Sequence, residues 1–149
     1  MRDNQKLPLM LRLASVQRAK RLAAEAQMNE AASAAQKAAA ADAVAMQLRT
    51  DAEGEWTDYL GRPSFTPEFA RALSAQLIDR AEEASQAAER KQKALNEQSE
   101  KQQAWRVLEA GVRQSDGSIR KLRRQVARRT DEKRLAELGD RTTYAWSRR

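Results

Sequence analysis

Apolar and small residues recur at alternating three- and four-residue intervals along two long stretches of the chain, separated by one short segment. This spacing is typical of α-helices that pair through one face, as in a coiled coil. The separating segment, residues 61–67, reads Gly-Arg-Pro-Ser-Phe-Thr-Pro, and proline interrupts helices. The pattern predicts an all-α fold, a long antiparallel two-helix coiled-coil hairpin forming a single domain. We expect helix 1 over about 7–59, a turn at 60–66, helix 2 over about 67–138 and a basic tail at 139–149.

Helix 1 is expected to begin at Leu7 or Leu9, with Pro8 in the first turn, where proline is tolerated. One heptad frame places a set of apolar residues on a single seam, namely Leu9, Leu13, Val16, Ala23, Ala34, Ala41, Val44 and Leu48. The same frame also contains Lys20, Gln27, Glu30 and Lys37. Because alanine fills much of the stretch 23–45, we expect close but thin packing.

Helix 2 has a clear start signal, with Thr66 as N-cap, Pro67 in the first turn and Glu68 at the positive end of the helix dipole. Its apolar frame continues through Leu73, Leu77, Ala84, Ala87, Ala94, Trp105, Leu108, Val112, Ile119, Leu122 and Val126. Polar members of the frame are Arg80, Lys91, Gln98, Lys101 and Ser115.

Gly111 and Gly117 are the weak points of helix 2, since each glycine in a helix interior costs about 1 kcal/mol relative to alanine. The apolar frame keeps its phase across both glycines, which favours a continuous helix. A break near Gly117, with Ser118 capping a new helix, remains open. Beyond Val126 the phase is lost.

Folding the chain about its turn places residues opposite each other when their numbers sum to roughly 128, to within one heptad. On this register Val16 meets Val112 and Leu9 meets Ile119. Helix 2 then outruns helix 1, and residues after about Arg124 form a basic overhang.

The composition argues against catalysis. The chain has no cysteine and no histidine, which removes disulfides, thiolate nucleophiles, most zinc sites and the usual general base at neutral pH. Two paired helices also offer no desolvated cleft for acid–base chemistry. We therefore expect no enzyme activity, no catalytic residue, no cofactor and no metal ion.

The N-terminal apolar run is too short to span a bilayer and is interrupted by Arg12. We therefore expect no direct membrane insertion and no secretory signal. The absence of cysteine fits a reducing cytoplasm. A transit-peptide or membrane-surface function of the first 24 residues, which hold one acidic residue, remains open.

The positive charge is concentrated at the C-terminal end. Residues 1–119 hold 17 basic and 17 acidic residues, whereas residues 120–149 hold 11 basic and 4 acidic residues, so the net charge of +7 arises in the last thirty positions. The run Arg120–Arg129 is compatible with a solvated helix face or with nucleic-acid binding. We prefer insertion into an acidic protein cavity, because Leu122 and Val126 keep one face apolar.

Five of the seven aromatic residues fall into two groups. Trp105 lies on the seam of helix 2 and is interpreted as a core residue. Trp56, Tyr59, Phe65 and Phe69 surround the turn, where they either pack the turn or form an exposed docking surface.

These features together resemble the small coiled-coil stalk proteins of type III export machines, the flagellar FliJ proteins and their YscO-type virulence counterparts. The resemblance covers most of the chain. The segments that carry it are the apolar and arginine-rich opening 9–21, the aromatics around the turn, Trp105-Arg-Val-Leu-Glu109 and the arginine-rich stretch 123–138. Gly111, Gly117, the proline-flanked turn and the tail 142–149 depart from the family pattern and leave the subfamily open.

The resemblance implies a cytoplasmic protein, peripheral to the inner-membrane export apparatus, that links a hexameric export ATPase to the cytoplasmic domain of the export gate. It also implies an association with export chaperones. The implied ATPase-binding residues are Leu9, Leu13, Val16, Leu122, Arg123, Arg124, Val126, Arg128 and Arg129. The implied gate-binding residues are Trp56, Tyr59, Phe69 and Leu73. No nucleic acid is expected as a partner on this interpretation, and the alternatives are a basic nucleic-acid-binding coiled coil and a generic adaptor.

Overall fold

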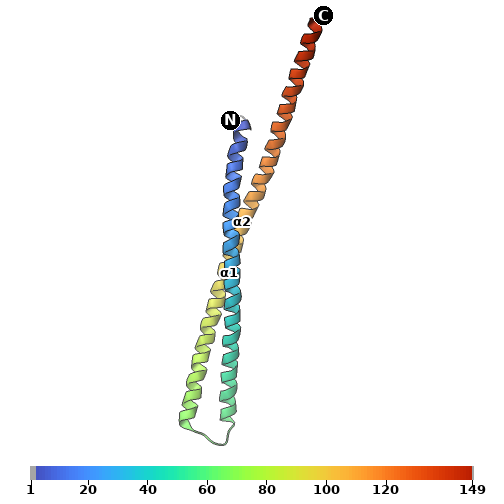
Figure 1. Ribbon diagram of the computed structural model, residues 1–149. Coiled ribbons are helices and arrows are strands. Elements are labelled where there is room, and N and C mark those ends of the chain that lie inside the picture. Colours follow the sequence, from blue (N-terminus) through green and yellow to red (C-terminus); the bar gives the residue numbers. More distant parts are fainter. Residues whose placement is uncertain (1–2, 149) are drawn as a thin grey trace. The chain divides into compact units, whose positions relative to one another are not determined.

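The computed structural model describes residues 3–148, and within this range the chain contains two helices and no strand. Helix α1 covers Asp3–Leu60 and helix α2 covers Pro67–Ser147, with the turn at residues 61–66 between them (Figure 1). The predicted all-α fold, a long antiparallel two-helix hairpin, is confirmed.

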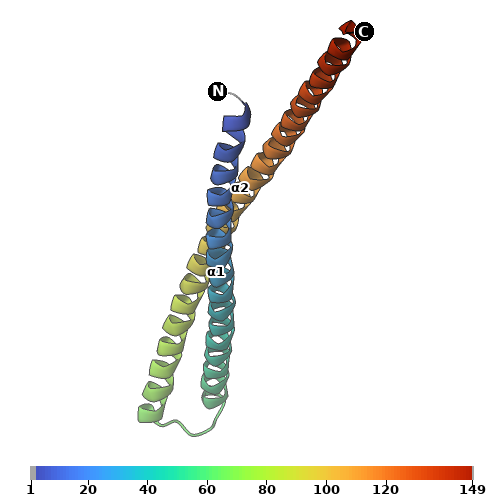
Figure 2. The same ribbon diagram turned by 45° about the horizontal axis from the view of Figure 1, so that its top comes forward.

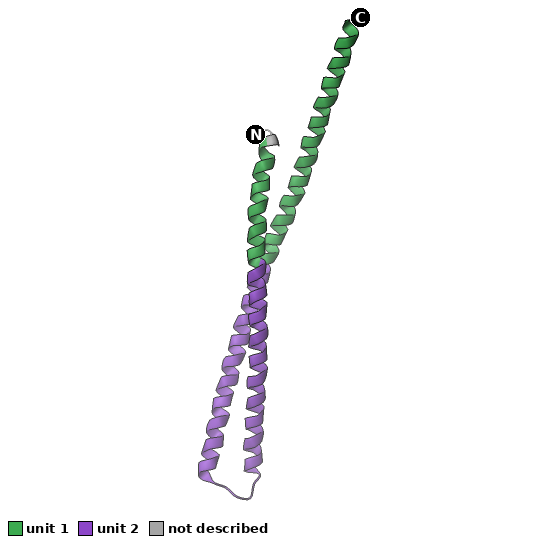
Figure 3. Ribbon diagram, in the orientation of Figure 1, with its two compact units in different colours: residues 1–24, 105–149 green, residues 25–104 purple. Residues whose placement is uncertain are grey.

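The chain forms two compact units, each of which contains part of both helices (Figure 3). The tip unit, residues 25–104, includes the turn. The terminal unit comprises residues 1–24 and 105–149. Within the terminal unit, α2 continues past the first described residues of α1 (Figure 2).

Polar contacts between the helices fix their antiparallel register. In the tip unit, Lys91 Nζ lies 2.9 Å from Asp42 Oδ2, and Lys101 Nζ lies 3.4 Å from Gln27 Oε1. In the terminal unit, three further pairs join the helices: Arg21 with Glu109, Arg18 with Asp116, and Gln17 with Ser115. The residue numbers of these five pairs sum to values between 128 and 134, so the predicted register is confirmed to within one heptad.

Both helices are longer than predicted at the chain ends. Helix α1 begins at Asp3, so Pro8 lies inside it and its predicted place in the first turn is wrong. The missing amide of Pro8 removes one backbone hydrogen bond. Helix α2 continues through the predicted tail to Ser147, while residue 149 lies outside the described range. A single glycine at 139 is too weak a signal to end a helix, since its cost is about 1 kcal/mol.

Helix α2 runs without interruption through Gly111 and Gly117. The continuous helix is therefore confirmed, and the alternative of a break capped by Ser118 is wrong. No heavy atom outside the adjoining backbone lies within 4 Å of the Cβ position that alanine would occupy at either glycine. Burial of the continuous apolar frame therefore offsets the helix-propensity cost of the two glycines.

The predicted seam of α2 is confirmed. Leu73, Ala84, Ala87, Val112, Ile119 and Leu122 are buried, and the other frame positions are half-buried. Trp105 is half-buried on this seam and its Nε1 is shielded from solvent, as expected of a core residue.

The predicted seam of α1 is wrong. Leu9, Leu13, Val16 and Val44 are each more than half exposed, and the other members, Ala23, Ala34, Ala41 and Leu48, are exposed as well. The frame that faces α2 is a different one, represented by Leu7, Met10, Ala14, Gln17, Arg21, Ala24, Met28, Ala31, Ala35, Ala38, Asp42, Ala45, Ala52, Trp56 and Tyr59.

In the terminal unit this frame places two small side chains, Ala14 and Ala24, against α2, together with Leu7, Met10, Gln17 and Arg21. In the terminal unit the seam of α2 carries large residues, including Trp105, Val112 and Ile119. A seam of fixed width is filled best when large residues on one helix meet small residues on the other. Ala14, which is 2% exposed, allows the helices to approach closely. If α1 were rotated so that Leu13 faced α2 instead, the larger side chain would hold the helices apart.

The seam of the tip unit contains a buried carboxylate. Asp42 is 5% exposed; its Oδ2 accepts a hydrogen bond from Lys91, whereas its Oδ1 is shielded and has no partner. A buried ion pair with an unsatisfied atom adds little net stability, because desolvation offsets the attraction. The pair is therefore better understood as fixing the register of an alanine-rich seam.

This interpretation gives a paired prediction for unfolding by urea, followed by far-UV circular dichroism. Asp42→Ala is expected to leave the free energy of unfolding unchanged or to raise it by about 1 kcal/mol. Lys91→Ala, which leaves the carboxylate buried without its partner, is expected to lower it by about 1–3 kcal/mol. A larger loss for Asp42→Ala than for Lys91→Ala would contradict the proposed role.

Candidate partner-binding surfaces

The charges are divided sharply among three segments. Residues 1–24 hold 6 basic and 1 acidic side chains, and residues 120–149 hold 11 basic and 4 acidic side chains. Residues 50–83, around the turn, hold 3 basic and 8 acidic side chains, and the remaining positions balance. The terminal unit therefore has a net side-chain charge of +12 and the tip unit one of −5. Residues 1–119 are neutral as a whole because the positive charge of residues 1–24 offsets the negative charge of residues 50–83.

The basic overhang predicted for the C-terminal end is present. Every residue from 127 to 148 is exposed, as are Arg123 and Arg124. Of the predicted ATPase-binding residues in α2, the four arginines Arg123, Arg124, Arg128 and Arg129 thus lie on the surface. Leu122 is buried and Val126 half-buried in the seam, so these two side chains offer less surface to a partner than the arginines do.

An apolar stripe runs along α1 in the terminal unit. Leu9, Leu13 and Val16 are 52%, 56% and 52% exposed, and their spacing places them on one side of the helix. Each precedes a seam position by one residue and so lies about 100° around the helix from the seam. The three predicted ATPase-binding residues of α1 therefore form a surface that α2 leaves uncovered.

A second apolar stripe lies on the overhang. Leu135 and Leu138 are 68% and 57% exposed, and Leu138 borders a shallow hollow together with Arg134, Glu137 and Arg141. The two leucines stand two residues beyond the positions that the α2 seam would reach, and hence about 200° around the helix from it. Helix α1 therefore does not bury this stripe, and only another segment or molecule could.

Tyr59 holds the turn together. It is 6% exposed and packs with Ala70 and Leu73, with Trp56 against the cluster. Its hydroxyl accepts a hydrogen bond from the Thr66 amide at 2.6 Å and donates one to the Thr66 carbonyl oxygen at 2.9 Å. Its ring also contacts Phe69 edge-on, with centroids 5.0 Å apart. The turn is therefore fastened to the end of α1 at the position where α2 begins.

The predicted gate-binding residues consequently divide into two kinds. Tyr59 and Leu73 are buried, so their side chains stabilise the turn and offer little surface to a partner. Trp56 is half-buried and Phe69 is 48% exposed. Tyr59 therefore packs the turn, whereas Phe65 and Phe69 are exposed; that the exposed aromatics dock on a partner stays a prediction.

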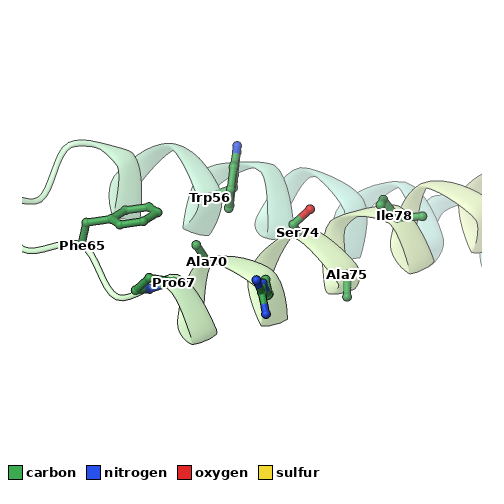
Figure 4. A pocket seen from close by; sticks show the side chains of 8 residues that line it. Trp56, Phe65, Pro67, Ala70, Ser74, Ala75 and Ile78 are labelled. Atoms are coloured by element: carbon green, nitrogen blue, oxygen red, sulfur yellow. The ribbon is translucent and has the colours of Figure 1, made fainter.

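An open hollow of about 450 Å³ lies beside the turn. Trp56 from α1, Phe65 from the turn and Ile78 from α2 line it (Figure 4), and Arg71 is its one charged residue. Phe65 and Ile78 are 68% and 63% exposed. Phe65 was predicted as a candidate docking aromatic but not as a gate-binding residue. Ile78 was not predicted, although it follows the seam residue Leu77.

Metal sites and membrane-spanning segments are two further classes of functional feature. Among the described residues, no three acidic side chains are grouped so as to hold a metal ion. Neither helix, over the part of the chain that the structure covers, contains a segment long and apolar enough to cross a membrane.

Comparison of the chain with models of protein families gave no match. Comparison with curated proteins and with solved structures likewise gave no match. The function of these surfaces is therefore inferred from their own chemistry.

Proposed function

We propose that this chain is the central stalk of a type III protein export apparatus, flagellar or virulence-associated. On this proposal the terminal unit enters the central pore of a hexameric export ATPase, and the tip unit contacts the cytoplasmic domain of the export gate. The chain is then a non-enzymatic component in the cytoplasm, peripheral to the inner membrane. Export chaperones are further candidate partners.

The observation that carries the proposal is the combination of charge and uncovered apolar surface in the terminal unit. A net charge of +12 coincides there with the exposed stripes Leu9–Leu13–Val16 and Leu135–Leu138. Apolar stripes of this kind are typical of surfaces that a protein partner covers. An acidic cavity with apolar walls would complement both features.

The mechanism follows from the mismatch between a two-helix end and a ring of six subunits. Two helices contact the subunits of such a ring unequally, so that insertion favours ring assembly or couples the nucleotide cycle to the gate. The arginines at the inserted end act mainly by steering the encounter, because charge complementarity raises association rates more than affinity.

The proposal is tested by adding the purified chain to the export ATPase of the same organism and measuring ATP hydrolysis. The triple variant Arg123→Glu, Arg124→Glu and Arg128→Glu is expected to return hydrolysis to the basal rate, because it reverses the charge of exposed residues without touching the seam. Circular dichroism should show unchanged helix content.

A matched control places the same charge change in the tip unit, with Arg62→Glu, Arg71→Glu and Arg90→Glu, all at exposed positions. This variant should stimulate the ATPase as the wild type does. Equal stimulation by the wild type and the terminal variant would contradict the proposal.

Nucleic-acid binding is the second candidate, since the exposed arginines of the terminal unit also suit phosphates. It is separated from the first by titration with duplex DNA and RNA at several salt concentrations. Phosphate-driven binding would weaken steeply with salt, and it would not depend on Leu9, Leu13 or Val16.

A further inference from the structure

We propose that the basic end of α2, residues 120–148, docks on the acidic tip of a second copy of this chain, along the hollow beside the turn. This contact does not depend on the export function proposed above. It accounts for three features that one copy leaves unmatched: the excess of carboxylates at the tip, the apolar hollow there, and the apolar stripe of the overhang.

The acidic tip has few internal counterions. Of its eight carboxylates, two form ion pairs with arginine, namely Glu53 with Arg49 and Glu83 with Arg80. Asp51 and Glu82 accept hydrogen bonds from neutral glutamines. The remaining four have no hydrogen-bond or ion-pair partner among the described residues, and they are Glu55, Asp58, Glu68 and Asp79.

The charge of the tip selects a basic partner. Residues 50–83 have a net charge of −5, and residues 120–149 have one of +7. Opposite potentials of this size steer two surfaces together and disfavour like-charged pairings such as tip on tip. A second copy approaching head to tail is therefore favoured over a symmetric contact between two tips.

The apolar surfaces agree with the same pairing. A helix that lies in a groove presents apolar anchors at three- and four-residue spacing. In the overhang, Leu135, Leu138, Thr142 and Ala145 have this spacing, and the two leucines are exposed. The hollow is lined mainly by α2, with Trp56 from α1 and Phe65 from the turn, and Arg71 is its one charged residue. The unpaired carboxylates Glu68 and Asp79 are next in sequence to Pro67 and Ile78, which line it. Contact between these surfaces removes apolar area from water on both copies.

Sedimentation velocity of the wild-type chain, over a range of concentrations, tests the contact directly. We expect concentration-dependent association at about 0.05 M salt and its loss at about 0.5 M salt, where exposed charges are screened. A contact within one chain would not depend on concentration. A wild-type chain that stays monomeric at low salt, at every concentration measured, would overturn the proposal.

Two charge variants identify the surfaces. The tip variant carries Asp58→Lys, Glu68→Lys and Asp79→Lys, and the end variant carries Arg124→Glu, Arg128→Glu and Lys133→Glu. Each alone is expected to associate at least about tenfold more weakly than the wild type at low salt. Circular dichroism checks that both keep their helices, since all six positions are exposed.

Mixing the two variants separates this contact from other modes of association. The tip variant keeps an intact basic end and the end variant keeps an intact acidic tip, so an equimolar mixture should form a complex of one copy of each. The double variant Phe65→Ser, Ile78→Ser should self-associate more weakly than the wild type, because both residues line the hollow. Self-association that survives both charge variants, or a mixture that stays monomeric while the wild type associates, would place the contact elsewhere and refute the proposal.

Discussion

Replacement of Tyr59 by alanine is expected to lower the free energy of unfolding of the hairpin by about 3–5 kcal/mol, as for other buried aromatic residues. Tyr59 is the largest side chain in the buried cluster at the tip. It also supplies both hydrogen bonds between the end of α1 and Thr66. Its removal leaves a cavity and releases the start of α2. Urea unfolding followed by circular dichroism measures the loss.

Tyr59→Phe serves as the matched control because it keeps the ring and removes only the hydroxyl. The Thr66 carbonyl oxygen retains its bond from the Ala70 amide, at 3.0 Å, but the Thr66 amide loses its acceptor. We expect a loss of about 1 kcal/mol, the net contribution of a typical hydrogen bond, because Thr66 is exposed and water can reach its amide. Equal stability of Tyr59→Ala and the wild type would show that the cluster does not hold the turn.

Substitution by aspartate at two adjacent positions of α1 is expected to give opposite results. Leu13 is 56% exposed and Ala14 is 2% exposed. Leu13→Asp should change the free energy of unfolding by no more than about 0.5 kcal/mol, as is usual for exposed positions. Ala14→Asp buries a charge without a partner in the seam and should reduce stability by several kcal/mol, or prevent pairing of the terminal unit.

The same pair tests the proposed binding surface. On the proposed function, Leu13→Asp abolishes stimulation of the export ATPase while the hairpin remains folded, because the uncovered stripe would contact the ring. Unfolding experiments on both variants, together with ATPase assays on Leu13→Asp, distinguish the outcomes. If the Leu13→Asp variant were destabilised and the Ala14→Asp variant were not, Leu13 would be the buried residue. That result would support the seam predicted from the sequence and contradict the structure.

The contrast between the two seams explains how much of the fold the sequence could predict. In α2 the large residues Trp105, Val112 and Ile119 occur in one frame, so the phase of the buried face was readable. In α1 alanine occurs in every frame, and large apolar residues occur in two of them, so that Leu9 and Leu13 indicated the wrong frame although Leu7 and Met10 occupy the right one. Which face of an alanine-rich helix is buried depends on the size of the side chains opposite, and this information lies in the other helix.

The candidate surfaces were predictable to a similar extent. The overhang followed from helix lengths and from the charge of the last thirty residues. The exposure of Leu9, Leu13 and Val16 did not, because the frame that contains them was assigned to the seam. The acidic tip was missed because its carboxylates are offset in number by the basic residues of positions 1–24.

The exposed overhang also affects the energetics of any contact made through it. Residues 127–147 are helical, yet no other element shields their backbone hydrogen bonds. Most of the stability of helices in proteins comes from tertiary packing, and this segment has none. Local fraying and rapid amide hydrogen exchange are therefore expected to concentrate there. A partner that covers one side of the overhang suppresses this fraying, so part of the interaction free energy is used to order the segment rather than to tighten binding.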